Sequence, residues 1–155
     1  MKIPPSMEKE LQAWNNGAGI DLESWTSCLG SFSMAVGYAS IFWPDFVVFE
    51  DYILRDGFGI SELRGFEEAY PEDPRAIEAV MNHLHISDIH VGCEDLTADK
   101  AQVLGETLRS IYTVKLAGEF PDRPCRVEFY QPEDIENLDD YQITFWQEKH
   151  EKDTP

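Results

Sequence analysis

The stretch from Ser31 to Trp43 constrains the fold of this chain more than any other part of the sequence, because it is apolar on nearly every side. Read as a helix, it has two apolar stripes where a surface helix has one. The stripes are Phe32, Val36 and Trp43, and Met34, Tyr38 and Ile41. A helix of this kind is normally surrounded by other elements, so we expect it in the middle of the molecule. Its length at helical rise, about 20 Å, is too short to span a bilayer.

The length and composition predict one folded unit. The chain has 155 residues, of which 43% are hydrophobic and 12% aromatic. This length is close to the commonest domain size, and this composition is incompatible with disorder. We therefore expect a single globular domain over residues 1–155, with about eight polar residues fraying at its carboxyl end.

Helical spacing of apolar residues, with capping residues and prolines at the ends, predicts about five helices. One of the best marked opens at Asp73-Pro74 and carries its apolar stripe as far as Leu84. Another runs from Thr97 to about Ala117, with Gly118 as its natural end.

Four short runs have the composition and alternation of strands. They are Phe46 to Phe49, Tyr52 to Leu54, Cys125 to Tyr130 and Tyr141 to Trp146. The last two form a hairpin-like antiparallel pair at the carboxyl end. The expected fold class is therefore α+β, with about five helices packed on a small, mainly antiparallel sheet.

The charge of the chain restricts its partners. Thirty acidic residues against twelve lysines and arginines give a formal net charge of -18, spread along the whole sequence. Such a field repels nucleic acid and anionic lipid and attracts basic proteins. We expect a basic protein as the partner, and neither nucleic acid nor membrane. The alternative is that the acidity serves solubility alone.

The cysteines and the amino terminus indicate the cytoplasm. Cys28, Cys93 and Cys125 are odd in number and widely spaced, so neither a disulfide framework nor a cysteine-based zinc site is expected. The amino terminus has no apolar leader segment.

One short run concentrates residues that bind metals. It contains His83, His85 and His90 with Asp88 and Cys93, which are ligand types for zinc or another divalent transition metal. The two nearest histidines share a side in an extended chain but lie about 200° apart on a helix, so the site depends on where the preceding helix ends. The alternative is three helix-end and loop histidines bonded to carbonyls or acids.

The spacing of this run resembles the H-x-H-x-D-H motif of metallo-β-lactamase-type hydrolases. Asp88 stands one place later than in that motif, and His90 is not adjacent to it. The resemblance covers eight residues and implies a metal-dependent hydrolase.

The connection between the two carboxyl-terminal strands, residues 132–140, is called the acidic loop below. It contains five acids and no base: Glu133, Asp134, Glu136, Asp139 and Asp140. Ile135 and Leu138 lie three residues apart within it. We expect both to face inward and cap the core. The alternative is a docking surface for a basic protein, with an apolar pair beside carboxylates.

The sequence contains no nucleotide-binding or serine-hydrolase motif. We therefore expect a non-enzymatic acidic protein-binding domain without a cofactor, for example an immunity or antitoxin-like neutraliser of a basic partner. One alternative is a metal-dependent hydrolase or metal-binding protein that uses the histidine run. Another is a structural domain.

Overall fold

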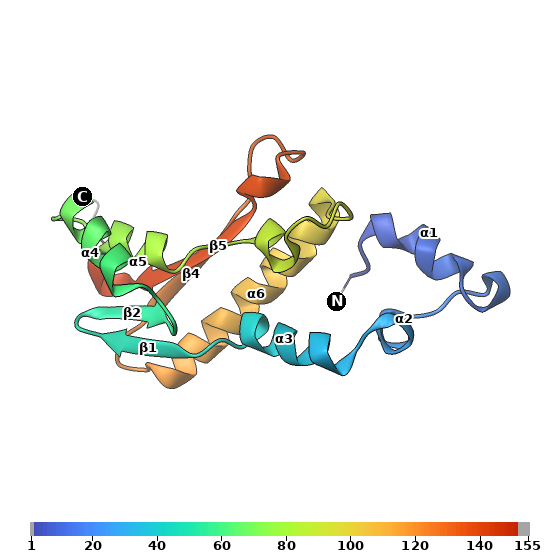
Figure 1. Cartoon of the computed structure of the whole chain (residues 1–155), viewed down its shortest axis with the longest axis horizontal. Helices are drawn as coiled ribbons and strands as arrows, with labels where there is room; N and C mark the ends of the chain where they lie inside the picture. The colour runs from blue at the N-terminus through green and yellow to red at the C-terminus, as the bar shows by residue number, and fades with distance from the viewer. Residues whose placement is uncertain (1, 152–155) are drawn as a thin grey trace.

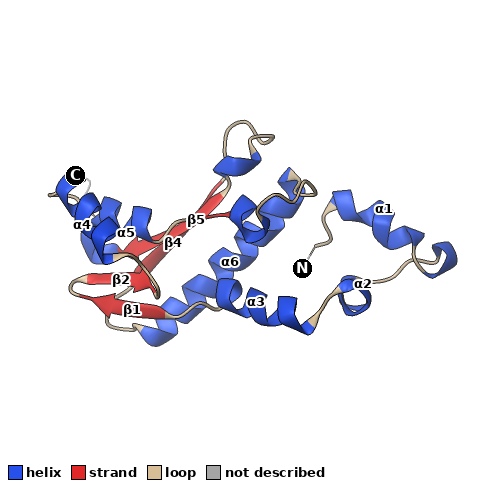
Figure 2. Ribbon diagram, in the orientation of Figure 1, coloured by secondary structure: helices blue, strands red, loops and turns tan. Residues whose placement is uncertain are grey.

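The computed structural model describes residues 2–151 and has the α+β architecture that the sequence predicts. Within these residues, six α-helices accompany two small antiparallel sheets (Figure 1, Figure 2). The helices are α1 (Pro5–Ala13), α2 (Leu22–Leu29), α3 (Phe32–Phe42), α4 (Ile60–Ala69), α5 (Pro74–Met81) and α6 (Ala98–Glu119). The strands are β1 (Phe46–Phe49), β2 (Tyr52–Arg55), β3 (Leu84–His85), β4 (Cys125–Tyr130) and β5 (Gln142–Gln147).

All strand pairs are antiparallel. β1 and β2 form a hairpin, and β3, β5 and β4 form a second sheet with β5 in its centre. The register of β4 and β5 places Arg126 opposite Trp146 and Cys125 opposite Gln147. The predicted carboxyl-terminal pair is thereby confirmed.

The main core lies between α6 and the three-stranded sheet. Its buried side chains include Leu108, Tyr112, Leu116, Ile143 and Phe145. Gly105 lies where α6 passes closest to β4, and a Cβ at this position would be 2.0 Å from the Phe129 ring. The lack of a side chain there allows the helix to approach the strand this closely.

Helix α5 joins the two sheets through a buried carboxylate. Glu78 is fully buried. Its Oε1 accepts a hydrogen bond from the Ile53 backbone N–H of β2 at 2.7 Å, and its Oε2 accepts one from the Gln147 N–H of β5 at 2.7 Å. The Gln147 side-chain amide also donates to Oε1, at 2.6 Å. One side chain therefore satisfies backbone groups of both sheets.

Asn82, one helical turn further, completes this bridge. Its Oδ1 accepts from Arg55 N at 3.1 Å, and its Nδ2 donates to Ile53 O at 2.8 Å and to Phe145 O at 3.3 Å. β3 pairs with β5 only as far as Ile143, so the backbone groups beyond it on that edge have no strand partner. The side chains of Glu78 in α5 and of Asn82, directly after this helix, take the place of the missing strand, as buried backbone groups require.

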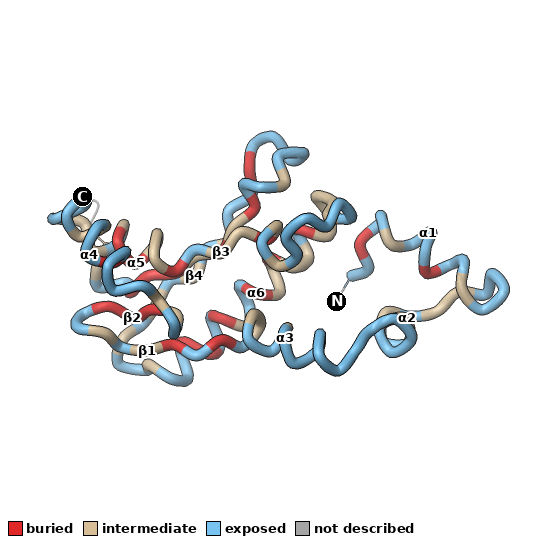
Figure 3. Tube along the Cα trace, viewed as in Figure 1, coloured by how far each residue is buried: buried red, intermediate tan, exposed pale blue. Residues whose placement is uncertain are grey.

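Helix α3 lies on the outside of the molecule, so the central position expected for Ser31 to Trp43 is wrong. None of its residues is buried, and Phe32 is 93% and Val36 73% exposed (Figure 3). Ile41, on the other stripe, packs against the main core. The physical reason is that α6 already covers the sheet, so α3 contacts the body with one stripe and leaves the other uncovered.

Two helix ends also differ from the expectation. α5 ends at Met81 and not at Leu84, because Asn82 leaves helical geometry and Leu84 pairs with β5 as a strand residue. α6 continues through Gly118 to Glu119.

The tail for which fraying is predicted lies partly within the described residues. Residues 148–150 form a 3₁₀ turn, in which Glu148 N donates to Pro124 O at 2.9 Å. Lys149 forms an ion pair with Asp51. Residues 152–155 lie outside the described part of the chain.

Replacing Asn82 by alanine is expected to lower the free energy of unfolding by about 2–4 kcal/mol, because two buried backbone groups and one part-buried group lose their partner. Urea denaturation followed by tryptophan fluorescence measures this. The control is Glu68→Ala, an exposed residue of α4, for which a change within about 0.5 kcal/mol is expected. Equal effects of the two substitutions would show that the bridge does not stabilise the fold.

Candidate functional site

The structure does not bring the three clustered histidines together. His83 contacts the Val80 carbonyl through Nδ1, and His85 Nδ1 lies 2.6 Å from the Asp139 carbonyl. His90 lies apart from both and contacts the Tyr38 hydroxyl at 2.6 Å. The rings of His83 and His85 are neighbours, with centroids 5.2 Å apart.

Across residues 2–151, no group of three or more histidine, cysteine, aspartate or glutamate side chains is arranged to hold a metal ion. Cys93 instead donates a hydrogen bond to Asp95, which also pairs with Lys100 at 3.2 Å. These two contacts lower the pKa of Asp95. The geometry that a shared ion needs is therefore not found in the histidine run.

The acidic loop projects between β4 and β5, beyond the end of the sheet (Figure 1). All five of its carboxylates are exposed: Glu133, Asp134, Glu136, Asp139 and Asp140. No ion pair of the described residues includes any of them. Their hydrogen bonds stay within the loop, for example from Asn137 Nδ2 to Asp140 Oδ2 at 2.6 Å. The loop therefore carries five charges that no neighbouring base neutralises.

The two apolar residues of the acidic loop lie on opposite sides of it. Leu138 packs against the main core, as expected. Ile135 is 58% exposed, so the expectation that it faces inward is wrong. Its carbonyl accepts a hydrogen bond from the Tyr141 hydroxyl at 3.1 Å, which ties the backbone down while the side chain points outward. The exposed surface of the loop thus combines carboxylates with one apolar side chain.

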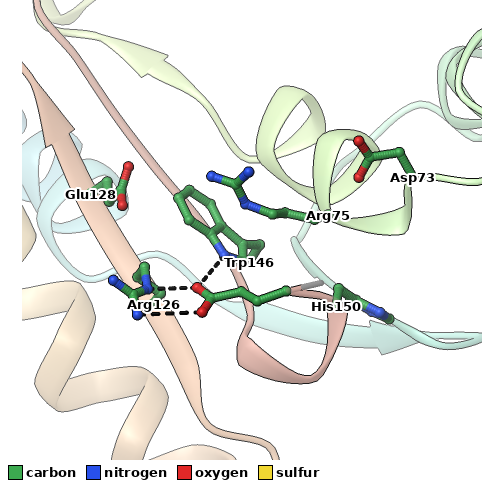
Figure 4. Close-up of a pocket in the computed structure, with 7 residues that line it drawn as sticks. Asp73, Arg75, Arg126, Glu128, Trp146 and His150 are labelled. Atoms are coloured by element: carbon green, nitrogen blue, oxygen red, sulfur yellow. Dashed lines mark hydrogen bonds and ion pairs between the residues drawn. The ribbon is translucent and has the colours of Figure 1, made fainter. Parts of the chain in front are cut away.

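A polar pocket of about 370 Å³, which the sequence analysis did not predict, lies over β4 and β5 (Figure 4). Its floor is Trp146, and the guanidinium of Arg75 lies 4.4 Å from the centre of that ring. Arg126 lies opposite Trp146 in the register of the two strands. Strand alternation and this register could have predicted that Arg126 and Glu128 share one face, but the contribution of Arg75 depends on how α5 packs.

The carboxylate bound in this pocket belongs to the chain itself. Glu151 accepts from Trp146 Nε1 at 3.0 Å and pairs with Arg126 Nε at 2.6 Å (Figure 4). These contacts lower the pKa of Glu151. The lining residues include no hydroxyl or thiol that could act as a nucleophile. The pocket has the chemistry of a carboxylate-binding site, occupied by a residue near the carboxyl end.

His150 connects this pocket to the buried bridge. It lines the pocket, and its Nε2 lies 3.7 Å from Glu78 Oε2. Burial raises the pKa of Glu78, and the N–H donors from Gln147 and Ile53 oppose that shift in part. A buried carboxyl group with a raised pKa therefore lies behind His150.

Comparisons with protein-family models, curated proteins and solved structures give no match for this chain. Among residues 2–151, no helix is both long enough and apolar enough to cross a lipid bilayer.

The raised pKa of Glu78 predicts a pH dependence of stability. The pKa of Glu78 is 4.5 in the unfolded chain and higher in the folded chain. At pH values between these two pKa values, the folded chain binds more protons at this site than the unfolded chain. The contribution of Glu78 to the free energy of unfolding therefore falls as pH rises through this window. Glu78→Gln removes the titration. Urea denaturation at a series of pH values measures the free energy of unfolding of both proteins. The value for the wild type minus that for the variant is expected to decrease as pH rises above 4.5. A difference that does not change with pH would contradict this.

Proposed function

We propose that this protein is a non-enzymatic acidic domain that binds a basic protein, in the manner of an immunity or antitoxin-like neutraliser. The observation that carries the proposal is the acidic loop, where five exposed carboxylates without ion-pair partners flank the exposed side chain of Ile135. In the histidine run, fewer unpaired charges lie beside an exposed apolar residue than in the acidic loop.

The charge of the loop favours association with a basic surface. Because its carboxylates have no partners within the described residues, binding breaks no existing ion pair. Long-range attraction from the net charge of -18 accelerates the encounter, and the loop provides the local contact. The exposed Ile135 adds apolar area at its centre, where a partner can exclude water.

Half of the twelve lysines and arginines are engaged away from the acidic loop. Six of them, distributed over the rest of the molecule, form ion pairs with acids of their own surroundings: Arg64, Lys100, Arg109, Lys115, Arg126 and Lys149. The three cysteines are free thiols, which fits a reducing compartment. The proposal therefore includes a cytoplasmic site of action.

Neutralising the acidic loop tests the proposal. The variant carries Glu133→Gln, Asp134→Asn, Glu136→Gln, Asp139→Asn and Asp140→Asn, and the probe is hen egg-white lysozyme, a basic protein. Calorimetry at low and at physiological salt measures affinity. The wild type is expected to bind with an affinity that falls steeply with salt, and the loop variant at least about tenfold more weakly.

A control variant of equal net charge separates the loop from the overall field. It neutralises five exposed acids elsewhere: Glu8, Glu62, Glu68, Glu72 and Asp122. Its affinity is expected to fall by less than about threefold, since distant exposed charges are largely screened. Equal losses in the two variants, or wild-type binding that ignores ionic strength, would sink the proposal.

Replacing Ile135 by serine tests the apolar contact by itself. Because the side chain is exposed, the free energy of unfolding is expected to stay within about 0.5 kcal/mol of the wild type. Affinity for the same probe is expected to fall about threefold or more through faster dissociation, because the charges that steer association are unchanged. Surface plasmon resonance measures both rates. A slower association with unchanged dissociation would contradict the assigned role.

A further inference from the structure

The polar pocket contains a complete binding arrangement for one carboxylate, which the proposed function does not use. Arg126 Nε and Trp146 Nε1 both contact Oε1 of Glu151, at 2.6 and 3.0 Å, and Arg126 Nη2 donates to Oε2 at 3.3 Å (Figure 4). Trp146 is only 2% exposed, so the packing around it fixes the direction of its N–H. A guanidinium that engages both oxygens matches the planar carboxylate group. The same donors can therefore receive the carboxylate of a ligand.

The side chain of Glu151 is held loosely enough to leave this position. Glu151 follows the 3₁₀ turn of residues 148–150, and its backbone N–H donates to Glu148 O at 3.0 Å. The paired side chains of Arg126 and Glu151 are 50% and 32% exposed. An ion pair as exposed as this one contributes little stability, because water competes for both partners and salt screens them. Rotation of the Glu151 side chain alone therefore opens the pocket to a competing carboxylate.

Two further charged side chains line the pocket and have no ion-pair partner among residues 2–151. One is Arg75, whose guanidinium lies over the Trp146 ring. The other is Glu128, which shares one face of β4 with Arg126. The carboxylate of Asp73, also in the lining, caps α5. Once the chain's own carboxylate turns away, the lining therefore contains two arginines and two carboxylates, which balance in charge.

We propose that the polar pocket binds a free α-amino acid, whose carboxylate replaces that of Glu151 and whose ammonium group lies beside Glu128. A pocket with equal numbers of bases and acids matches a zwitterion. A ligand without net charge is also not repelled by a chain of net charge -18, as a dicarboxylate would be. Arg126 and Glu128 are two residues apart on one strand face, about 7 Å along β4. A ligand with adjacent opposite charges can therefore meet both side chains.

The size and the chemistry of the pocket favour the free amino acid over a peptide. A peptide bond removes one of the two charges from the α-carbon, so ammonium and carboxylate occur together there only in the free amino acid. The volume of about 370 Å³ is at the lower end of small-molecule sites, which span roughly 300–1,000 Å³. The N–H groups of Arg75, which pairs with no acid of residues 2–151, can donate to a carbonyl on the ligand side chain. L-glutamine carries such a carbonyl and is therefore the probe.

Titration of the ¹⁵N-labelled full chain with L-glutamine tests this by NMR. The Trp146 indole N–H donates to the carboxylate that the ligand displaces, so its signal reports occupancy of the site itself. We expect a saturable shift of this signal at concentrations up to about 50 mM, because a ligand of this size binds in the millimolar range. Glu151→Gln removes the internal competitor and is expected to tighten binding about fivefold. The matched control is Glu148→Gln, an exposed acid of the preceding turn, which is expected to leave the affinity unchanged.

Two analogues and one variant test the recognition of each charge of the ligand. N-acetyl-L-glutamine lacks the ammonium group, and the α-amide of L-glutamine lacks the carboxylate. Each analogue is expected to bind at least about tenfold more weakly than L-glutamine, because one charged group of the pocket then has no partner in the ligand. Glu128→Gln is expected to weaken binding of L-glutamine at least about threefold and not to weaken that of N-acetyl-L-glutamine.

Two results would overturn the proposal. One is the absence of a saturable shift of the Trp146 signal in both the wild type and Glu151→Gln. The other is equal affinity for L-glutamine and N-acetyl-L-glutamine, which would show that the pocket does not recognise the ammonium group. Neither result bears on residues 132–140, which do not line this pocket, so the proposed function of the acidic loop would stand.

Discussion

The buried bridge from α5 to β2 and β5 is the interaction on which the rest of this structure depends. Glu78 and Asn82 supply hydrogen-bond partners to backbone groups of two sheets that do not pair with each other. Without these partners, buried N–H and C=O groups on both strands would remain unsatisfied, at a cost of about 1–3 kcal/mol each. The bridge also fixes β5, from whose ends the acidic loop and the segment with Glu151 extend.

Much of the fold was predictable because it follows from local patterns. Composition and alternation identified four of the five strands in the described residues and missed the two-residue β3. Asp73 before Pro74 identified the start of α5, where the Asp73 carboxylate accepts from Ala76 N at 3.0 Å. The bridge was not predictable, since a glutamate on an amphipathic helix looks the same in sequence whether water or a strand edge lies beside it. The position of α3 was missed for a related reason. Hydrophobicity shows that a helix has apolar faces but not how much of each face the rest of the chain covers.

The candidate site was predictable in composition but not in geometry. The five acids of the acidic loop were evident from the sequence, whereas the outward position of Ile135 required the tertiary structure. For the histidine run, everything depended on one helix end. Because α5 stops at Met81, His83 and His85 become neighbours in an extended segment, while the following turn carries His90 away to Tyr38. The residues of the polar pocket come from α5, β4, β5 and the 3₁₀ turn at residues 148–150, and they have no common sequence signal.

The proposed function requires that a basic protein docks on the acidic loop. Hydrogen–deuterium exchange of the chain, alone and with the basic probe, tests this most directly because it locates contact along the backbone. Docking at this loop predicts slower exchange on binding in residues 132–140, with residues 24–44 unchanged. Protection confined to residues 24–44 or to the histidine run, with the acidic loop exchanging as in the free protein, would contradict docking at the loop.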